Sequence, residues 1–329
     1  MTTRVTKNNH CEVVNPMTAK VILNPYAGRW KALKMQNVVK SELSNAGIDF
    51  EFVVTDQPGH GTELAAEAVR DGFSPIISAG GDGSISEVVN GIVQETLSRG
   101  SSSPVPLGIM PLGSANDLVV NLGLPINLPE AARVIATGNI RMIDIGEVKA
   151  WDKNKQNFSS HYFDNNSAIG LEPSITLIQQ RIKWLHGPLR YLLATLIGVI
   201  KNPQWTMSLE WDNGSYQGPA TLVTVGNNPL TGGLFYMTPH ADPADGLLTF
   251  VYGAVKTRRQ ILQILPRTMK SGEDNYVEHP SINELHITRL SIQTDQPTPV
   301  HADGEIMLSD AHFIEYRILP FFLPVLVTP

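Results

Sequence analysis

A glycine-rich segment that carries one carboxylate is the sharpest chemical signal in the sequence. Residues Gly80–Ser84 read Gly-Gly-Asp-Gly-Ser and follow the apolar pair Ile76-Ile77. Glycines let a backbone turn tightly and bring its N–H groups against a phosphate, and the N-terminus of a following helix adds a positive dipole. Asp82 in this segment would reach a metal ion or a phosphoryl group through water. The segment therefore predicts a phosphate-binding loop.

Two better-known glycine motifs are excluded, and one plain alternative remains. The sequence has no Gly-Lys pair, which excludes a Walker A loop, and the segment lacks the third glycine of a Rossmann fingerprint. The alternative is an ordinary strand-to-helix turn in which Ser84 and Glu87 form a capping box. Glu87 can act as such a cap and also serve the site.

A second loop repeats the pattern after the next apolar run. Leu107–Met110 leads into Pro-Leu-Gly-Ser-Ala-Asn-Asp at residues 111–117. A helix is expected to start near Ser114, with Asn116 and Asp117 in its first turn after Gly113. Alone, Ser-x-x-Asp is ordinary helix-start chemistry. Two such loops after consecutive strands favour a single phosphate site.

A third segment, His301–Glu305, places Asp303 and Glu305 on either side of a glycine. A surface turn has the same composition. An enzyme that transfers a phosphoryl group to a hydroxyl, however, needs a carboxylate that accepts the hydroxyl proton. In the company of the two glycine loops, this pair is a candidate for that role.

The elements that would position these loops alternate over residues 18–138. Strands are expected at 21–23, 50–54, 76–77 and 107–110, with helices after Pro25 to about 46, at 62–70, at 84–97 and from about 114. Such repetition predicts parallel strands with helices packed on the faces, and ligands in such sheets bind at the carboxyl ends of the strands. Both glycine loops lie at such ends.

After about residue 140 the texture changes to short β-rich runs separated by Gly, Pro, Asn or Asp, at 206–211, 220–225, 247–252, 285–292 and 312–319. This pattern predicts an antiparallel β-sandwich or barrel-like domain. A chain of 329 residues with 42% hydrophobic residues has the size and the apolar content for two domains. We predict an α/β domain with the phosphate-binding loops over 1–140 and a β-sandwich over 141–329, from which residues 312–329 can return to the first domain.

Charge and cysteine content narrow the class of protein further. A net charge of −6 and a pI near 5.8 argue against a nucleic-acid partner, which needs a basic footprint. Cys11 is the single cysteine, which fits a reducing compartment. Residues 1–16 are too polar for a signal peptide, and the longest apolar stretch, Leu192–Ile200, is shorter than the about 20 residues that span a bilayer. We expect a soluble, cytoplasmic protein.

The order of these motifs resembles one family. Asn24-Pro25-x-x-Gly28 is followed by Gly-Gly-Asp-Gly-Ser, then Pro-Leu-Gly-Ser-Ala-Asn-Asp, and finally Asp-Gly-Glu, as in diacylglycerol kinase catalytic domains. The chain resembles the bacterial lipid kinases of that group, whose relatives include sphingosine and ceramide kinases. The likeness runs from about Lys20 to Leu319. Each motif is modest alone, but the ordered set is specific.

The resemblance implies a nucleotide-binding α/β domain paired with a β-sandwich, with ATP bound in the cleft between them. It implies that Asp303 is the general base on a lipid hydroxyl, with Glu305 beside it. It further implies that Asp82, Asp117 and Asp144 organise water and Mg²⁺ around the phosphates. The residues expected to contact the nucleotide and its metal are Asn24, Gly80, Gly81, Asp82, Gly83, Ser84, Glu87, Gly113, Ser114, Asn116, Asp117 and Asp144.

In some relatives, a segment that matches residues 232–247 holds a structural magnesium ion through carboxylates and a backbone carbonyl, which are ligands that a hard cation prefers. The matching candidates here are Asp242, Asp245 and the carbonyl of Leu247. Without the resemblance, this stretch would be a turn before a strand.

The chain also departs from the family pattern. Ala27 stands where a serine is usual, and Ser84 and Ser114 stand where threonine is usual. The basic residue often found after the Asn-Asp pair is absent, because Val119-Val120-Asn121 follow. The electrostatic attraction of phosphate is then weaker or comes from elsewhere.

Two segments without Asp or Glu, 173–209 and 247–272, combine basic and apolar residues. Such a surface suits an anionic membrane, where each Lys or Arg contributes about 1 kcal/mol. A core helix with a solvated basic edge explains the same pattern equally well. The basic residues are Arg181, Lys183, Arg190 and Lys201 in the first segment and Lys256, Arg258, Arg259, Arg267 and Lys270 in the second.

Together these features predict an ATP- and Mg²⁺-dependent lipid kinase that contacts the membrane peripherally. Two alternatives stay open: a NAD kinase, which shares a Gly-Gly-Asp-Gly loop, and a non-catalytic nucleotide-binding regulator. The Asp303–Glu305 segment favours a lipid over NAD, and the intact carboxylates argue against loss of turnover, although Ala27 gives the regulator slight support. The sequence leaves open whether the substrate is diacylglycerol, a sphingoid base, phosphatidylglycerol or undecaprenol, and whether the chain forms a homodimer.

Overall fold

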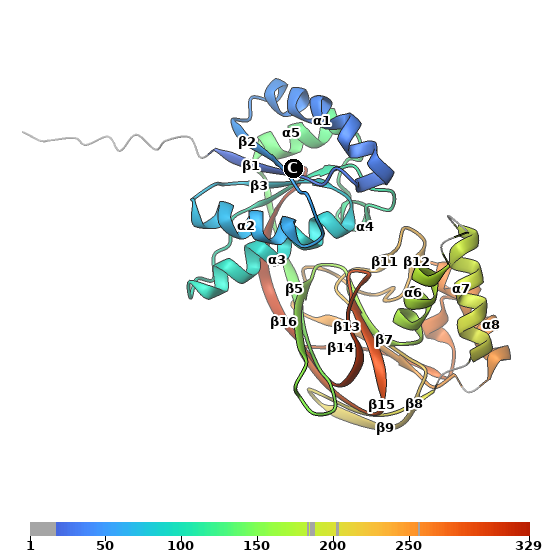
Figure 1. Ribbon diagram of the computed structural model, residues 1–329. Coiled ribbons are helices and arrows are strands. Elements are labelled where there is room, and N and C mark those ends of the chain that lie inside the picture. The colour runs from blue at the N-terminus through green and yellow to red at the C-terminus, as the bar shows by residue number, and fades with distance from the viewer. Residues whose placement is uncertain (1–17, 183, 185–187, 202–203, 256) are drawn as a thin grey trace, which may run out of the picture.

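The computed structural model describes residues 18–329 except 183, 185–187, 202–203 and 256. Fourteen strands of this part of the chain form one continuous sheet, with an α/β region at one end and a β-sandwich at the other (Figure 1). The predicted fold class is therefore confirmed. Within the described ranges, no helix is long and apolar enough to cross a membrane.

Four parallel strands form the sheet of the α/β region. They stand in the order β2 (Phe50–Val54), β1 (Ala19–Leu23), β3 (Ile76–Gly80), β4 (Leu107–Pro111). Strands β3 and β4 are buried along their whole length, as expected where helices cover both faces of a parallel sheet. One apolar cluster joins the sheet to α1 (Ala27–Asn45) and α5 (Leu128–Thr137), and a second joins it to α2 (His60–Arg70) and α3 (Asp82–Ser98).

The short helix α4 (Asp117–Asn121) begins three residues later than the sequence predicted. Asn116, immediately before it, has a left-handed backbone with φ 55°, and its Oδ1 accepts a hydrogen bond of 3.0 Å from the N–H of Gly113. This side chain closes the loop locally in place of a first helical turn. The predicted start near Ser114 was therefore wrong.

The sandwich is built from antiparallel strands around a core that includes Phe163, Phe250 and Tyr316. One predicted run, Leu285–Ile292, is in fact two strands that part at Thr288, whose N–H and hydroxyl both donate to Asp212. The strands here are β6 (Phe158–Phe163), β7 (Asn166–Gly170), β8 (Trp205–Trp211), β9 (Gly214–Ala220), β10 (Leu222–Gly226), β13 (Leu248–Gly253), β14 (Ile282–Ile287) and β15 (Arg289–Ala302). A separate hairpin contains β11 (Leu230–Thr231) and β12 (Phe235–Tyr236).

Three helices cover one outer side of the sandwich (Figure 1). They are α6 (Leu171–Arg181), α7 (Pro188–Lys201) and α8 (Arg258–Ile264), which together with the short 3₁₀ turns at 265–269 and 276–278 enclose a further apolar cluster around Tyr276. The acid-free segments 173–209 and 247–272 thus contain helices that contribute to a core. This is what the interpretation as core helices with a solvated basic edge required.

Two long strands join the regions. β5 (Ile140–Trp151) and β16 (Glu305–Leu326) pair antiparallel from Phe313 to Leu326, and Val325 of β16 pairs in parallel with Leu107 of β4. The chain end therefore returns to the α/β region, and the predicted boundary after residue 140 falls at the start of a strand rather than in a linker. The position of each loop relative to the others is set by this shared backbone ladder.

Candidate functional site

The two glycine loops lie against each other at the carboxyl ends of β3 and β4. The N–H of Leu112 donates to the carbonyl of Gly80 at 2.7 Å, and a Cβ added at Gly81 would lie 2.9 Å from the Cα of Gly113. Only glycine fits such a backbone approach. The segment that begins at Asn24 completes this edge, because a Cβ on Gly28 would meet the carbonyl oxygen of Leu112 at 2.7 Å.

Asp82 connects the two glycine loops. Its Oδ2 accepts from the N–H of Asn116 at 2.9 Å, and its Oδ1 accepts from the N–H of Asp117 at 2.5 Å. The first loop thus holds the second through one carboxylate, which accepts hydrogen bonds from two successive backbone N–H groups. Ser84 is buried against Gly80, whereas Gly83 and Ser114 face outward. Asn24 uses its Oδ1 to accept from the N–H of Tyr26 at 3.0 Å.

Glu87 does not form the capping box with Ser84 that the alternative interpretation of this segment required. The helix α3 begins after Gly81 without a side-chain cap, and the Glu87 carboxylate instead accepts from the N–H groups of Gly59 and Gly61 at 2.8 and 2.9 Å. These donors belong to the start of α2, whose free N–H groups favour an anionic partner. Glu87 therefore ties α2 to α3.

Asp117 binds the β11–β12 hairpin of the sandwich region. Its two carboxylate oxygens accept from the N–H groups of Gly232 and Gly233 at 2.6 and 2.7 Å, where both glycines have a left-handed backbone. Asn121, one turn later, exchanges two hydrogen bonds with the backbone of Leu230 at 3.2 and 3.3 Å. The helix that follows the second glycine loop is thereby fixed to the other half of the molecule.

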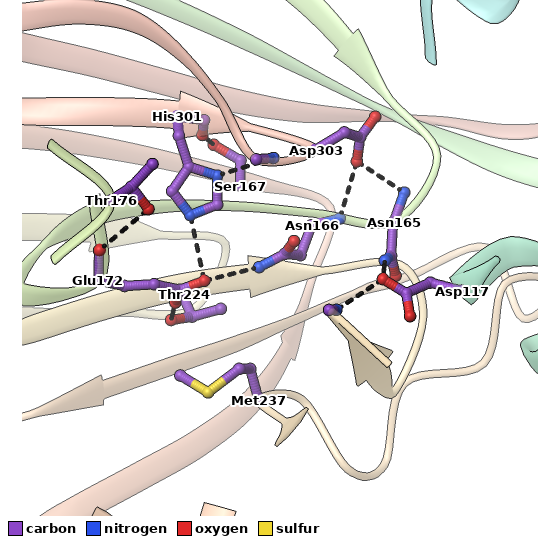
Figure 2. Close-up of polar contacts among 12 residues, drawn as sticks. Asp117, Asn165, Asn166, Ser167, Glu172, Thr176, Thr224, Met237, His301 and Asp303 are labelled. Atoms are coloured by element: carbon purple, nitrogen blue, oxygen red, sulfur yellow. Dashed lines mark hydrogen bonds and ion pairs between the residues drawn. The ribbon is translucent and has the colours of Figure 1, made fainter. Parts of the chain in front are cut away.

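Asp303 lies in the tight turn between β15 and β16, opposite the glycine loops. Its φ of 45° is left-handed, and its N–H donates to the carbonyl of Asn166 at 2.8 Å. Its carboxylate accepts from the N–H groups of Asp164, Asn165 and Asn166 at 3.3, 3.1 and 3.1 Å, of which Figure 2 shows the last two. Glu305 is exposed beside this turn.

The polar run Asp164–Asn166 was missed by the sequence analysis, although three polar residues before a buried strand were a visible signal. A second missed group lies behind it, where Nε2 of His301 contacts Oε1 of Glu172 at 3.1 Å (Figure 2). Burial alone would raise the pKa of Glu172, but the hydrogen bond and charge of His301, with a hydrogen bond from Thr224, hold this pKa below its usual value.

A third missed contact joins α3 to β6. The Asn90 side chain accepts from the N–H of Tyr162 at 2.9 Å and donates to Nε2 of His161 at 2.9 Å. Ser86 also contacts that nitrogen at 3.1 Å. Burial lowers the pKa of His161, so the neutral ring is favoured.

Three carboxylates converge where the loops meet. Burial raises the pKa of Asp82, and burial together with the charge of Asp82 raises the pKa of Asp117 to about 6. The charge of Asp303 adds to both shifts. Converging oxygen donors of this kind fit Mg²⁺, a hard cation that keeps several of its waters. Within the described residues, no group of three or more His, Cys, Asp or Glu side chains is placed to ligate a metal directly.

Asp144 is buried in β5, and its carboxylate binds segments other than the glycine loops. Its carboxylate accepts from the N–H of Gly246 at 2.8 Å and from that of Phe321 at 2.6 Å, which ties the 242–247 turn to β16. In the same turn, Asp242 accepts from Ala244 and Asp245 accepts from Leu247, both across two residues. Asp242, Asp245 and Leu247 are thus close together next to Asp144, and the structural magnesium site stays a prediction.

The raised pKa of Asp117 predicts that the free energy of unfolding depends on pH, because burying the ionised carboxylate destabilises the folded chain. We expect the stability of wild type relative to Asp117→Asn to fall by about 1–3 kcal/mol as pH rises from 4 to 7.5. The folded chain binds the proton of the Asp117 carboxyl more tightly than the unfolded chain. The stabilisation that this proton gives is therefore complete below pH 3.8 and is lost as pH rises through about 6. Urea unfolding of both proteins in chelator across this range measures it.

The substitution also removes one acceptor for the Gly232 and Gly233 N–H groups at every pH. The trend with pH is therefore the test rather than the difference at one pH. A difference in free energy of unfolding that stays constant from pH 4 to 7.5 would contradict the assignment.

Comparison with known proteins identifies the family of the chain. Residues 18–148 match the diacylglycerol kinase catalytic domain, and residues 166–327 match the YegS C-terminal NAD kinase beta sandwich-like domain. The chain is 31% identical over 288 residues to a probable lipid kinase YegS of Shigella flexneri, covering 87% of this chain and 89% of that protein. It is 27% identical to a diacylglycerol kinase of Mycobacterium tuberculosis, covering 86% and 87%.

Solved structures share the fold at lower identity. A putative diacylglycerol kinase from Bacillus anthracis superposes with a TM-score of 0.73 at 22% identity, covering 95% of this chain and 97% of that one. A yeast NADH kinase complexed with NADH superposes with a TM-score of 0.53 at 11% identity, covering 96% and 85%. The sequence relatives, which extend over most of the chain, show that this protein belongs to the diacylglycerol kinase family of lipid kinases, in the group that includes the YegS proteins.

Proposed function

We propose that the chain transfers the γ-phosphate of ATP to the hydroxyl of a lipid, in a Mg²⁺-dependent reaction where the glycine loops face the β15–β16 turn. One observation carries the proposal. Gly81 and Gly113 are in backbone contact, and the charge of Asp303 adds a small part to the rise in the pKa values of Asp82 and Asp117 that burial mainly causes. Both parts of this observation support one site that contains the glycine loops and the candidate base.

The two loops would bind the phosphates through backbone N–H groups, with the start of α3 adding its dipole. Asp303 would accept the proton of the lipid hydroxyl. The hydroxyl oxygen would attack the γ-phosphorus while the bond between that phosphorus and ADP breaks. Bound Mg²⁺, near Asp82 and Asp117, would neutralise charge on the phosphate oxygens. Glu305 is exposed beside Asp303 and free to orient the incoming hydroxyl.

Two other functions compete with this one. A NAD kinase would use the same Gly-Gly-Asp-Gly loop, and the yeast NADH kinase shares the fold. A non-catalytic regulator would keep the loops and lose transfer. Incubation with labelled ATP and either NAD or a panel of lipids in mixed micelles separates the three, because only one class of acceptor, or none, becomes labelled.

Backbone contact between the loops predicts that Gly81→Val weakens ATP binding. The added side chain would lie against the backbone of Gly113, so the loops must separate and their N–H groups leave the phosphates. Gly272→Val is the matched control, because Gly272 lies outside the glycine loops and a Cβ there meets nothing within 4 Å. We expect calorimetry to show at least about tenfold weaker ATP binding for the first variant and near-normal binding for the second. Equal affinity in both, with both folded, would refute the phosphate-loop assignment.

The base assignment predicts that Asp303→Asn lowers turnover by about 10²–10⁴-fold while ATP affinity stays near wild type. The amide cannot accept the hydroxyl proton, whereas the glycine loops are untouched. Asp310→Asn, an exposed change on β16 just after the turn, serves as the control. Steady-state kinetics with ATP titration measures both. Turnover of Asp303→Asn within a few-fold of wild type would remove Asp303 from the base role.

We also propose peripheral docking on anionic membrane through the side covered by α6, α7 and α8. Trp184 is 74% exposed between α6 and α7, and Ile200 and Leu262 are more than half exposed on α7 and α8. Exposed basic residues accompany them at Arg181, Lys201, Arg258 and Arg259. The described part of the chain does not include Lys183, Lys256 or the side chain of Arg190, which the sequence also assigned to this surface.

Replacing Arg181, Arg258 and Arg259 by Gln is predicted to weaken binding to anionic vesicles, with wild-type binding falling as salt rises. Membrane attraction contributes about 1 kcal/mol per basic residue and is screened over about 8 Å at physiological ionic strength. Activity on a short-chain soluble substrate should stay unchanged. Replacing the exposed Lys34, Arg133 and Lys153 instead gives a control with the same change in charge. Vesicle sedimentation measures binding of both triple variants. If they bind anionic vesicles equally, the proposed docking surface is wrong.

A further inference from the structure

Glu172, in the first turn of α6, has no role in the steps above. Its side chain accepts three hydrogen bonds from other side chains (Figure 2). Its Oε1 accepts from Nδ2 of Asn166 at 3.2 Å and from Nε2 of His301 at 3.1 Å, and its Oε2 accepts from the hydroxyl of Thr224 at 3.0 Å. These donors belong to β7, β15 and β10, so one carboxylate bridges three neighbouring strands.

The register of the sheet explains why these donors meet. Thr224 pairs with Ala168, and Ala168 pairs with His301. The side chains of Thr224 and His301 therefore project from the same face of the sheet, on either side of a small residue. The N–H of the first α6 residue donates to the carbonyl of Thr221 at 3.0 Å, which fixes the start of the helix on β10. The Glu172 carboxylate is thereby held over the three strands.

Two of the three partners are also linked to Asp303. Asn166 exchanges two backbone hydrogen bonds with it, because its N–H donates to Oδ1 of Asp303 at 3.1 Å and its carbonyl accepts from the Asp303 N–H at 2.8 Å. His301 lies two residues before Asp303 in β15, and its carbonyl accepts from the Ser167 hydroxyl at 2.6 Å. The left-handed backbone of Asp303, with φ 45°, persists only where the surroundings hold it. Glu172 contacts both strands that provide this hold.

We propose that Glu172 is a positioning residue, which holds Asn166 and His301 and thereby keeps the Asp303 carboxylate opposite the glycine loops. The inference rests on the proposed role of Asp303 as the base. Glu172 itself exchanges no proton in the transfer step and touches no phosphate. Its contribution is to fix the strands on either side of the Asp303 turn.

Loss of the Glu172 acceptors should move this turn. The side-chain N–H groups of Asn166 and His301 would be left buried without a partner, which is unfavourable, so both side chains would rearrange. The backbone of Asn166, which holds the Asp303 carboxylate, would then shift. A displacement of about 1 Å at a reacting group can lower a rate by about 100-fold. ATP binding, which we assign to the glycine loops, should be spared.

The test compares Glu172→Gln with Glu172→Met in the full chain. Both variants remove the charge and have a similar length. Glutamine keeps a carbonyl oxygen for Asn166 and His301, and its amide can donate to the Thr224 hydroxyl, whereas methionine offers only a weakly accepting sulfur. We expect kcat of the Gln variant within about threefold of wild type and kcat of the Met variant lower by about 10–100-fold, with the KM for ATP unchanged.

Two results of this comparison would overturn the inference. One is wild-type kcat in the Met variant, and the other is a loss in the Gln variant as large as in the Met variant. Thermal unfolding verifies that each variant is folded. If the Met variant does not fold, Asn166→Ala tests the same link, because it deletes the amide that Glu172 holds and keeps the backbone bonds to Asp303. We expect its kcat to be about 3–30-fold lower, and an unchanged kcat would contradict the proposal.

Hydrogen exchange gives a readout that does not depend on activity. Amides in peptides that cover 164–168 and 300–305 should exchange at least about fivefold faster in the Met variant and near the wild-type rate in the Gln variant. Unchanged exchange in the Met variant would show that the turn does not depend on Glu172.

Asp212→Leu is the control for loss of any carboxylate that binds strands of the sandwich. Asp212 accepts from the N–H and the hydroxyl of Thr288, at the opposite end of β15 from the Asp303 turn. The folded Asp212→Leu variant should keep its turnover. A fall in its kcat as large as that of Glu172→Met would refute a specific role of Glu172.

Asp303→Asn separates this inference from the proposed function. If that variant keeps its turnover, the base assignment fails and the positioning role fails with it. If Asp303→Asn is nearly inactive while Glu172→Met matches wild type, only the inference about Glu172 is wrong. Added to Asp303→Asn, Glu172→Met should lower the residual turnover by less than about twofold, because residues that act as a unit are not additive. A full additional loss in this double variant would mean that Glu172 acts independently of Asp303, which contradicts the inference.

Discussion

The backbone ladder between β5 and β16 is the constraint on which the rest of the structure depends. These strands pair through both regions, and β16 finishes beside β4 of the parallel sheet. The turn that carries Asp303 lies at the first residues of the same strand. A change in the angle between the regions must therefore bend two paired strands. The ladder is already interrupted at one place, between Leu319 and Leu323, where Asp144 holds the backbone of Phe321.

Carboxylates hold the site together because they accept hydrogen bonds from backbone N–H groups of neighbouring segments. Asp82 holds the second glycine loop, Asp117 holds the β11–β12 turn, and Asp303 holds the start of β7. Each carboxylate offsets part of its desolvation through these charge-assisted hydrogen bonds. Burial, and to a smaller extent the repulsion between the carboxylates, still raises the pKa values of Asp82 and Asp117. A site that stores negative charge in this way is stabilised by a cation.

The departures from the family pattern have structural explanations here. Val119 is buried in the apolar core of the α/β region, and Asn121 is paired with the backbone of Leu230. The stretch where relatives often carry a basic residue is thus used to hold the two halves together. Ser84 is buried against Gly80, so the smaller hydroxyl side chain suits the space available. Nothing in the structure explains the alanine at position 27.

The amino-acid sequence by itself determined the fold class, the four strands and first three helices of the α/β region, the family and the loops that gather at one edge of the sheet. These features follow from local periodicity, from glycines that permit tight turns and from the order of motifs along the chain. The roles of individual site residues stay predictions. The tertiary structure decided which donor each carboxylate meets: Glu87 binds the start of α2 instead of capping its own helix, and Asp117 binds glycines 115 and 116 residues away. It also brought Asp164 against Asp303 across 139 residues. Sequence spacing could not reveal these pairs, because a hydrogen bond depends on separations in space that only the packed sheet defines.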